Sequence, residues 1–311
     1  MGLARAIGHP DYSGVGSSSG FIPEIWSGKL VEKLYDATVF ASICNTDYEG
    51  EISDVGDKIW IRTRATVAIK DYVKGQTLVY EKLESPKIEM VIDKGKYFGF
   101  AVDDVDAYQS DLNLLNDWSD DASEQMKIVI DTEILAFIPT DIAAANQGLT
   151  AGRKSSSYIL GVSGTPLQIT KADVLDRIVD CGSVLGEQNV PEGGRWMVIP
   201  EWFAGLIKKS DLKDASLTGD GKSILRNGRI GMIDRFELFS SNNVYSVVDG
   251  AVTAYNVVFG DNGALTFASQ ITKMQHIPTP ESTFAELVRG LNVYGRKMVN
   301  NARVGTLYCY K

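Results

Sequence analysis

The sequence predicts an α+β protein in which a long β-hairpin, one long helix and a mixed α/β unit follow one another along the chain. Apolar residues alternate with polar ones on both sides of residues 71–86, as strands with one buried face require. From about residue 110 to 137 they recur at helical spacing instead, and after residue 170 helical and strand patterns alternate. These changes of period define the order of the elements.

The N-terminal segments and the hairpin come first. Residues 13–20 are rich in Gly and Ser and are expected to form a flexible arm, followed by a short amphipathic helix with Pro23 in its first turn. The strands KIWIRTR (58–64) and KIEMVID (87–93) flank the segment 71–86, which we interpret as a polar tip containing Lys74-Gly75. A two-stranded hairpin supplies no core, so this projection needs another surface to lie on.

The long helix is expected to run from about Ser110 to Phe137 and to end before Pro139, because proline cannot continue a helix. Its apolar side chains form one stripe: Leu112, Leu115, Ala122, Met126, Val129 and Ile130. Carboxylates precede or open it, where the positive end of the helix dipole stabilises them: Asp103, Asp104, Asp106 and Asp111.

The α/β unit is predicted to begin at Thr170, which with Asp173 resembles a capping box ahead of a helix. A buried strand is expected at WMVI (196–199), and Pro200 is expected to begin a second short helix. Strand patterns then follow within residues 229–243, 252–260 and 263–271. Residues 284–310 are predicted to form two closing strands around Asn300-Asn301.

Composition and charge limit the class of protein. The 311 residues are enough for one large or two medium domains, and 44% apolar with 23% charged residues is ordinary globular composition. The formal net charge of −9 argues against a protein that grips nucleic acid, because phosphate binding needs a basic face. It permits a container for DNA, since a weakly repulsive wall does not trap the entering duplex.

Cysteine spacing indicates a reducing compartment. Cys44, Cys181 and Cys309 lie far apart and form no CxxC pair, so no disulfide framework is expected. The sequence contains no apolar run of the ~18 residues that a membrane span needs, and its start does not resemble a secretion signal. We therefore expect folding in the cytoplasm and no membrane partner.

The sequence contains no complete catalytic, metal or cofactor motif among the patterns that it partly matches. GDGKS (219–223) ends like a phosphate loop, but that loop needs Gly where this chain has Ser216. Gly14, Gly16 and Gly20 have the wrong spacing for a dinucleotide loop, and the aspartates at the helix start lack calcium-loop spacing. His9 and His276 have no framed nucleophile and no evident partner in sequence. The chain is thus predicted to have no catalytic, metal or cofactor residues and not to be an enzyme.

Two basic patches and the tryptophans remain. Lys208-Lys209 with Lys213, and Arg226 with Arg229, either face DNA or anionic neighbours or form a solvated or salt-bridging surface, which is the more usual arrangement. Large aromatic residues more often anchor a core or an interface than line a cofactor site. We therefore interpret the tryptophans as core or interface residues: Trp26, Trp60, Trp118, Trp196 and Trp202.

The order of these elements resembles the tailed-bacteriophage major capsid proteins (the Johnson, or Hong Kong ninety-seven, fold). Several stretches resemble that family locally, and it is their order from about Gly20 onward that carries the likeness: FIPEIW (21–26), GDKIWI (56–61), GRIGMIDRFELFSSN (228–242), VYGRKMV (293–299) and ARV (302–304). The resemblance implies an N-terminal arm and short helix at residues 1–50 and an extended hairpin at 51–100 that lies across an adjacent subunit. It implies a peripheral domain with the long spine helix at 101–169 and 278–311, and an axial domain at 170–277.

The function implied is that of a coat protein assembling into hexamers and pentamers of an icosahedral phage head. This virion component would assemble in the bacterial cytoplasm and enclose double-stranded DNA without sequence-specific binding. Its partners would be copies of itself and a portal protein. The sequence does not begin with the helical scaffolding segment of some family members, so a separate scaffolding protein is expected, unless that segment is removed by proteolysis. A decoration protein is a further partner that the family allows.

Alternatives stay open at this point. An encapsulin-like nanocompartment shell around a cargo enzyme would use the same fold, an α+β enzyme would need a site that the sequence does not reveal, and head-decoration or tail proteins lack the spine helix. Some family members cross-link a hairpin lysine to a neighbour's asparagine. Lys74 or Lys82 with Asn300 or Asn301 would be the pairs here, although no carboxylate is framed to accept the lysine proton.

Overall fold

The structure is a computed structural model, and it describes residues 38–47, 58–63, 65, 67–103, 114–210, 231–277 and 285–311. The predicted Gly/Ser-rich arm, the helix at Pro23 and the beginning of the long helix lie outside these residues.

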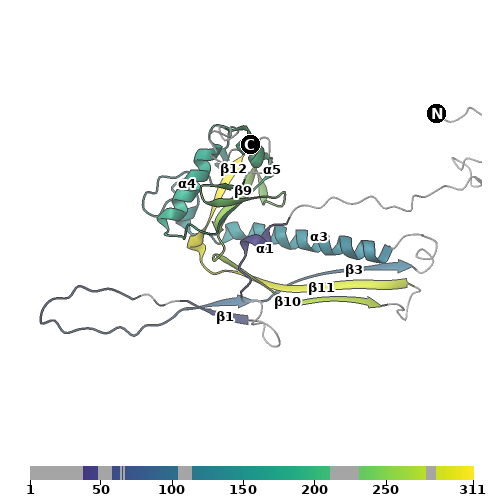
Figure 1. Ribbon diagram of the computed structural model, residues 1–311, viewed down its shortest axis with the longest axis horizontal. Coiled ribbons are helices and arrows are strands. Elements are labelled where there is room, and N and C mark those ends of the chain that lie inside the picture. The colour runs from purple at the N-terminus through teal and green to yellow at the C-terminus, as the bar shows by residue number, and fades with distance from the viewer. Residues whose placement is uncertain are drawn as a thin grey trace, which may run out of the picture.

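Three parts make up the molecule (Figure 1). A compact α/β unit lies at the top, an elongated layer of helix and sheet extends to the right, and a narrow hairpin extends to the left. The elongated layer contains the helix α3 (Leu114–Phe137) and a three-stranded antiparallel sheet, β10 (Leu265–Ile277), β11 (Ala285–Met298) and β3 (Lys94–Asp103). The hairpin contains β1 (Lys58–Arg62) and β2 (Lys87–Val91).

Helix α3 covers one face of the three-stranded sheet. Along β3 the even-numbered residues 94–102 face the helix and are buried or partly buried, whereas the odd-numbered residues 95–101 are exposed. The ring of Phe100 meets that of Trp118 edge to face at 5.8 Å. Nearer its end, α3 buries Ile134 and Leu135 in a core that also contains Tyr294. The helix ends before Pro139, as predicted, and its 24 residues span about 36 Å.

The α/β unit is built on a seven-stranded sheet with the order β4-β12-β9-β5-β7-β6, and β8 pairs with β9. Its strands are β4 (Leu167–Gln168), β5 (Arg195–Ile199), β6 (Met232–Ile233), β7 (Phe236–Ser240), β8 (Ser246–Asp249), β9 (Val252–Asp261) and β12 (Val304–Tyr310). Its helices are α4 (Val174–Glu187) and α5 (Glu201–Lys209). Short helical turns complete the chain: α1 (Phe40–Ile43), η2 (Ile138–Thr140), η3 (Ala144–Asn146) and η5 (Asn301–Arg303).

Strand β5 is buried at all five positions because both faces of the sheet are covered there. On one face, Met197 and Ile199 pack in a cluster with residues of α4 and α5. On the other face, Trp196 and Val198 belong to the cluster that contains the end of α3. The two clusters join the α/β unit to the elongated layer through one shared sheet.

Most of the predicted elements are confirmed, but the sheet pairings do not follow the segments expected from the resemblance. β10 falls in the segment 170–277 yet pairs with β11 in the elongated layer. β12 falls in the segment 278–311 yet pairs with β9 and β4 in the α/β unit. β3, most of which falls in the hairpin segment, pairs with β11. Alternation within a strand does not encode which sheet supplies its partner.

The predicted capping box at Thr170 is wrong in detail. Helix α4 begins at Val174, and its N-cap residue, Asp173, makes no side-chain bond to the helix backbone. The hydroxyl of Thr170 instead donates to the Asp173 carboxylate at 2.5 Å. The side chains that would satisfy the first helical N–H groups therefore bond to each other.

Two glycines in the loop before β4 give a matched test of the packing. Gly161 (φ +76°) and Gly164 (φ +87°) both have left-handed backbone, but an added Cβ would lie 2.1 Å from the carbonyl oxygen of Tyr308 at Gly161 and would meet nothing at Gly164. We expect Gly164→Ala to lower the free energy of unfolding by about 1–2 kcal/mol. Gly161→Ala should cost about 3 kcal/mol or more, because the backbone of β12 must move. Urea unfolding followed by tryptophan fluorescence measures both, and equal losses would contradict this packing.

Candidate interaction surface

The hairpin has two different halves. At its base, Ile59, Ile61 and Met90 form a small buried cluster with Ala268 of β10, so the base lies on the molecule's own sheet. At the neck, the Thr63 N–H and hydroxyl both donate to the carbonyl oxygen of Pro86, at 3.2 and 2.6 Å. Beyond the neck, the one backbone hydrogen bond between the described residues of the two arms is at the turn, where the Gln76 N–H donates to the carbonyl oxygen of Val73 at 3.0 Å. The β1–β2 hydrogen-bond ladder therefore ends at the neck.

The tip exposes large apolar side chains, which we call the tip patch: Val67, Ile69, Tyr72, Val73, Leu78, Val79, Tyr80 and Leu83. Ile69 and Tyr80 are the most exposed, at 93% and 88%. Contiguous apolar surface of this kind is typical of sites that bind another protein. The interpretation of residues 71–86 as a polar tip was therefore wrong. Charged residues are interspersed in this segment, but its exposed surface also carries large apolar side chains.

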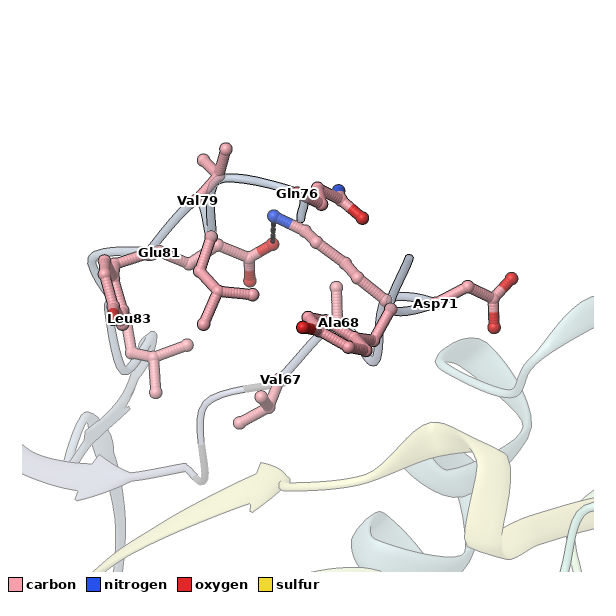
Figure 2. Close-up of a pocket in the computed structure, with 11 residues that line it drawn as sticks. Val67, Ala68, Asp71, Gln76, Val79, Glu81 and Leu83 are labelled. Atoms are coloured by element: carbon pink, nitrogen blue, oxygen red, sulfur yellow. Dashed lines mark ion pairs between the residues drawn. The ribbon is translucent and has the colours of Figure 1, made fainter. Parts of the chain in front are cut away.

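The arms of the tip enclose a hollow of about 450 Å³ (Figure 2). An ion pair between Lys70 and Glu81, 2.9 Å long, bridges the arms across it. At the turn, Gly75 has a positive φ of 86°, and the Val73 N–H donates to the side-chain oxygen of Gln76 at 3.2 Å. An exposed ion pair contributes only about 0–1 kcal/mol. The tip thus has little of its own to fix its shape.

A buried carboxylate on α3 holds the parts of the subunit together. Asp131 accepts hydrogen bonds from the backbone N–H groups of Val39 and Phe40, at 3.0 and 2.8 Å, and from the side-chain amide of Asn243 at 2.8 Å. It thereby supplies α1 with the cap that its own N-cap residue lacks. Burial raises the pKa of Asp131, and the bonds from Asn243, Val39 and Phe40 partly oppose that rise.

A second carboxylate, two residues on, fixes α3 to the three-stranded sheet. Glu133 forms ion pairs with Lys96 of β3 at 3.0 Å and with Arg296 of β11 at 3.1 Å, and it accepts a hydrogen bond from the Tyr294 hydroxyl at 2.9 Å. Burial alone would raise the pKa of Glu133, but the bonds from Lys96 and Tyr294 and the charge of Arg296 outweigh it and lower that pKa. Burial and Glu133 together raise the pKa of Tyr294.

Of the residues with candidate chemical roles, the structure describes Asp103 and His276. GDGKS (219–223), Asp104, Asp106 and His9 lie outside the described residues, and Asp103 ends β3. His276 does have a partner that sequence inspection missed, because its Nε2 lies 3.0 Å from the carboxylate of Glu286 on the neighbouring strand. Among the described residues, no group of three or more His, Cys, Asp or Glu could hold a metal ion.

Of the residues in the two basic patches and the tryptophans, the structure describes six: Lys208, Lys209, Trp60, Trp118, Trp196 and Trp202. Lys208 and Lys209 occupy the last turn of α5, where the helix dipole stabilises cations, and Lys213, Arg226, Arg229 and Trp26 lie outside the described residues. Trp196 is buried and Trp202 partly buried, whereas Trp60 and Trp118 are exposed. Within the described ranges, no helix has the length and apolar character needed to cross a membrane.

The suggested cross-linking residues also lie on the surface. Lys74 and Lys82 are exposed in the tip, and Asn300 and Asn301 are exposed between β11 and β12. The side chain of Asn300 accepts a hydrogen bond from the Ala302 N–H at 3.1 Å, which is an ordinary structural role.

Comparison with solved structures assigns the fold. A chain from Mycobacterium phage Che8 is 26% identical with a TM-score of 0.76, and the match covers 93% of this chain and 98% of that one. The capsid of cyanophage P-SCSP1u is 14% identical with a TM-score of 0.69, covering 98% and 100% of the two chains. This chain has the phage major capsid fold.

A further match is the mature capsid of bacteriophage PhiM1, 14% identical with a TM-score of 0.67, which covers 99% of this chain and 96% of that one. No protein-family model and no curated protein matches the sequence. The predicted α+β class and the resemblance to phage major capsid proteins are confirmed, and the likeness supports a structural, capsid-protein role.

Replacing Asp131 tests its part in holding the subunit together. Asp131→Ala leaves buried donors without an acceptor, so we expect it to lower the free energy of unfolding by about 2–4 kcal/mol. Because the folded-state pKa is raised, the stability of the wild type should fall as pH rises from 3.8 through that pKa, relative to the non-titrating Asp131→Asn. Denaturant unfolding across pH 3–8 measures this difference. A wild type that gains stability relative to Asp131→Asn as pH rises would contradict the raised pKa of the buried Asp131.

Glu133→Gln should show the opposite pH dependence. The lowered pKa means that the ionised side chain stabilises the folded chain above pH 4.5 and that this contribution is lost as pH falls through the folded-state pKa. The wild type should therefore exceed Glu133→Gln in stability at neutral pH and approach it in acid, in the same unfolding series. Parallel curves for the two proteins would show that the contacts of Glu133 with Lys96 and Arg296 do not stabilise the fold.

Proposed function

We propose that this chain is the coat protein of an icosahedral phage head, assembling with copies of itself into hexamers and pentamers that enclose double-stranded DNA. The observation that carries the proposal is the tip patch, an apolar surface on a projection that the chain does not support. A hairpin of this kind gains stability when it lies on a neighbouring subunit. Because the tip patch and the body that would receive it are different surfaces, the contact is head-to-tail and can close into rings.

The parts of the subunit have distinct roles in this proposal. The α/β unit serves as the axial domain that meets its copies around the symmetry axes, and α3 with β3, β10 and β11 serves as the peripheral domain. Each contact can be weak, since a subunit held by several neighbours is retained by multivalency. Rotation of these rigid parts against one another, with the hairpin as a hinge, would accommodate any expansion of the shell.

The proposed partners follow from that role. The net charge of −9 suits a shell that encloses DNA without gripping it. A portal protein and a separate scaffolding protein complete the head, a decoration protein is a further partner, and assembly takes place in the bacterial cytoplasm. Similar solved structures are described as phage capsids, which favours a head over a nanocompartment around a cargo enzyme.

Removal of the tip tests the proposal. The neck places Thr63 beside Pro86, so residues 64–85 can be replaced by a short flexible Gly/Ser loop that leaves β1 and β2 paired. We expect the shortened chain to keep its circular dichroism spectrum but to lose shells, with yields at least tenfold below the wild type in electron micrographs and sedimentation. Lys74→Ala, a single change at the exposed turn, is the control and should assemble normally. Normal shells from the shortened chain would remove the proposal's main support.

A further inference from the structure

The turn that joins β9 to β10 contains an Asn-Gly pair, Asn262-Gly263. The Asn262 side chain is exposed, and no hydrogen bond joins it to another described residue. Glycine has no Cβ, so nothing shields its backbone nitrogen from the side chain of the preceding residue. Because the two groups belong to neighbouring residues, this nitrogen can close a five-membered ring onto the side-chain carbonyl carbon of Asn262 once that side chain has rotated toward it.

Two charged groups lie at the Gly263 nitrogen. The Gly263 N–H donates to the carboxylate of Asp261 at 3.2 Å, and the same carboxylate forms an ion pair with Arg303 at 3.2 Å. A Cβ added at Gly263 would overlap Nη1 of Arg303, so the guanidinium lies directly against this glycine. A carboxylate that already holds the proton can accept it as the nitrogen attacks, and a neighbouring cation stabilises the negative charge that develops.

We propose that Asn262 deamidates spontaneously through attack by the backbone nitrogen of Gly263. The Gly263 N–H bond breaks and its proton passes to Asp261, while a bond forms from that nitrogen to the side-chain carbonyl carbon of Asn262. The bond from this carbon to the side-chain nitrogen then breaks, and the nitrogen leaves as ammonia with the proton that Asp261 returns. Water opens the resulting succinimide at one of its two carbonyl groups and leaves aspartate or isoaspartate at position 262.

The position of the turn gives the reaction a structural consequence. β9 belongs to the seven-stranded sheet and β10 to the three-stranded sheet, so the turn connects the α/β unit to the elongated layer. Both products place a new negative charge next to Asp261, and isoaspartate also lengthens the backbone of the turn by one atom. Like charges repel, and the longer turn no longer fits the hydrogen bond at 2.9 Å from the Ala264 N–H to the carbonyl oxygen of Asp261. The junction between the two parts of the subunit therefore changes with the age of the protein, whether or not the chain is assembled.

Incubation of the purified full chain at pH 8 and 37 °C, followed by peptide mapping with mass spectrometry, measures the reaction. A synthetic peptide with the sequence of residues 258–267 gives the rate without the fold. We expect Asn262 in the folded chain to react within tenfold of the peptide's rate and at least tenfold faster than the exposed Asn300. A methyltransferase specific for isoaspartate should label the same mapped peptide, and Asn262→Gln should abolish the label there. Mapping also separates this site from the other Asn-Gly pair, Asn227-Gly228, which lies outside the described residues. A rate at Asn262 more than tenfold below that of the peptide would overturn the proposal.

The part of Asp261 is tested by Asp261→Asn. This variant keeps the shape of the side chain, but its neutral carboxamide cannot accept the proton, so the rate at Asn262 should fall at least threefold. Asp131→Asn, which neutralises a buried carboxylate on α3, is the matched control for a general loss of stability and should leave the rate unchanged. A rate that does not fall in Asp261→Asn, or that falls equally in both variants, would overturn the role of Asp261. If Asp261→Asn does not fold, the comparison of the wild type with the peptide still decides whether Asn262 reacts.

Discussion

One constraint dominates this structure: the hairpin tip has no surface of its own chain on which to bury its apolar side chains. Its base has a buried cluster on β10, and its neck is closed by hydrogen bonds between Thr63 and Pro86, but the support ends there. Past the neck the described arms lack a ladder and expose the tip patch to solvent. Ordering such a segment costs backbone entropy that only contacts with another surface can offset.

The rest of the subunit is organised around α3, which two carboxylates fix to the elements around it. Asp131 joins it to the N-terminal segment and to Asn243 of the α/β unit, and Glu133 joins it to β3 and β11. The two carboxylates are two residues apart but have opposite pKa shifts, since burial prevails at Asp131, whereas at Glu133 the contacts with Lys96, Tyr294 and Arg296 together outweigh burial. Together they fix the helix to both sheets.

The sequence predicted local structure well because local periods survive in the fold. The alternation at residues 58–62 and 87–91, the helix ending before Pro139 and the buried strand at 195–199 are all confirmed. It did not predict which strands pair, because β10 and β12 choose partners by the edges available in the folded chain. The contacts of Asp131 could not be predicted either, because they join residues that are distant in the sequence: Val39 and Asn243 lie 92 and 112 residues from it.

The candidate surface was only half predicted. The absence of a core inside the hairpin followed from its two-strand pattern, and the structure agrees at the tip. The apolar character of the tip was missed, although Tyr72, Val79 and Tyr80 can be read from the sequence, because the charged residues between them were given more weight. The apolar hollow lined by Met126 of α3 and Met274 of β10 could not be predicted, since its lining comes from α1, β3, α3, β10 and β11 together.

Amide hydrogen exchange of residues 67–84 is the most direct measurement of the central constraint. In the unassembled subunit these amides should exchange at rates close to those of an unfolded chain, while the amides of α3 and β5 stay protected. In the assembled shell, residues 67–84 should become protected as well. Protection of the tip in the isolated, monomeric subunit would contradict the account, because it would show that the chain completes its own hairpin.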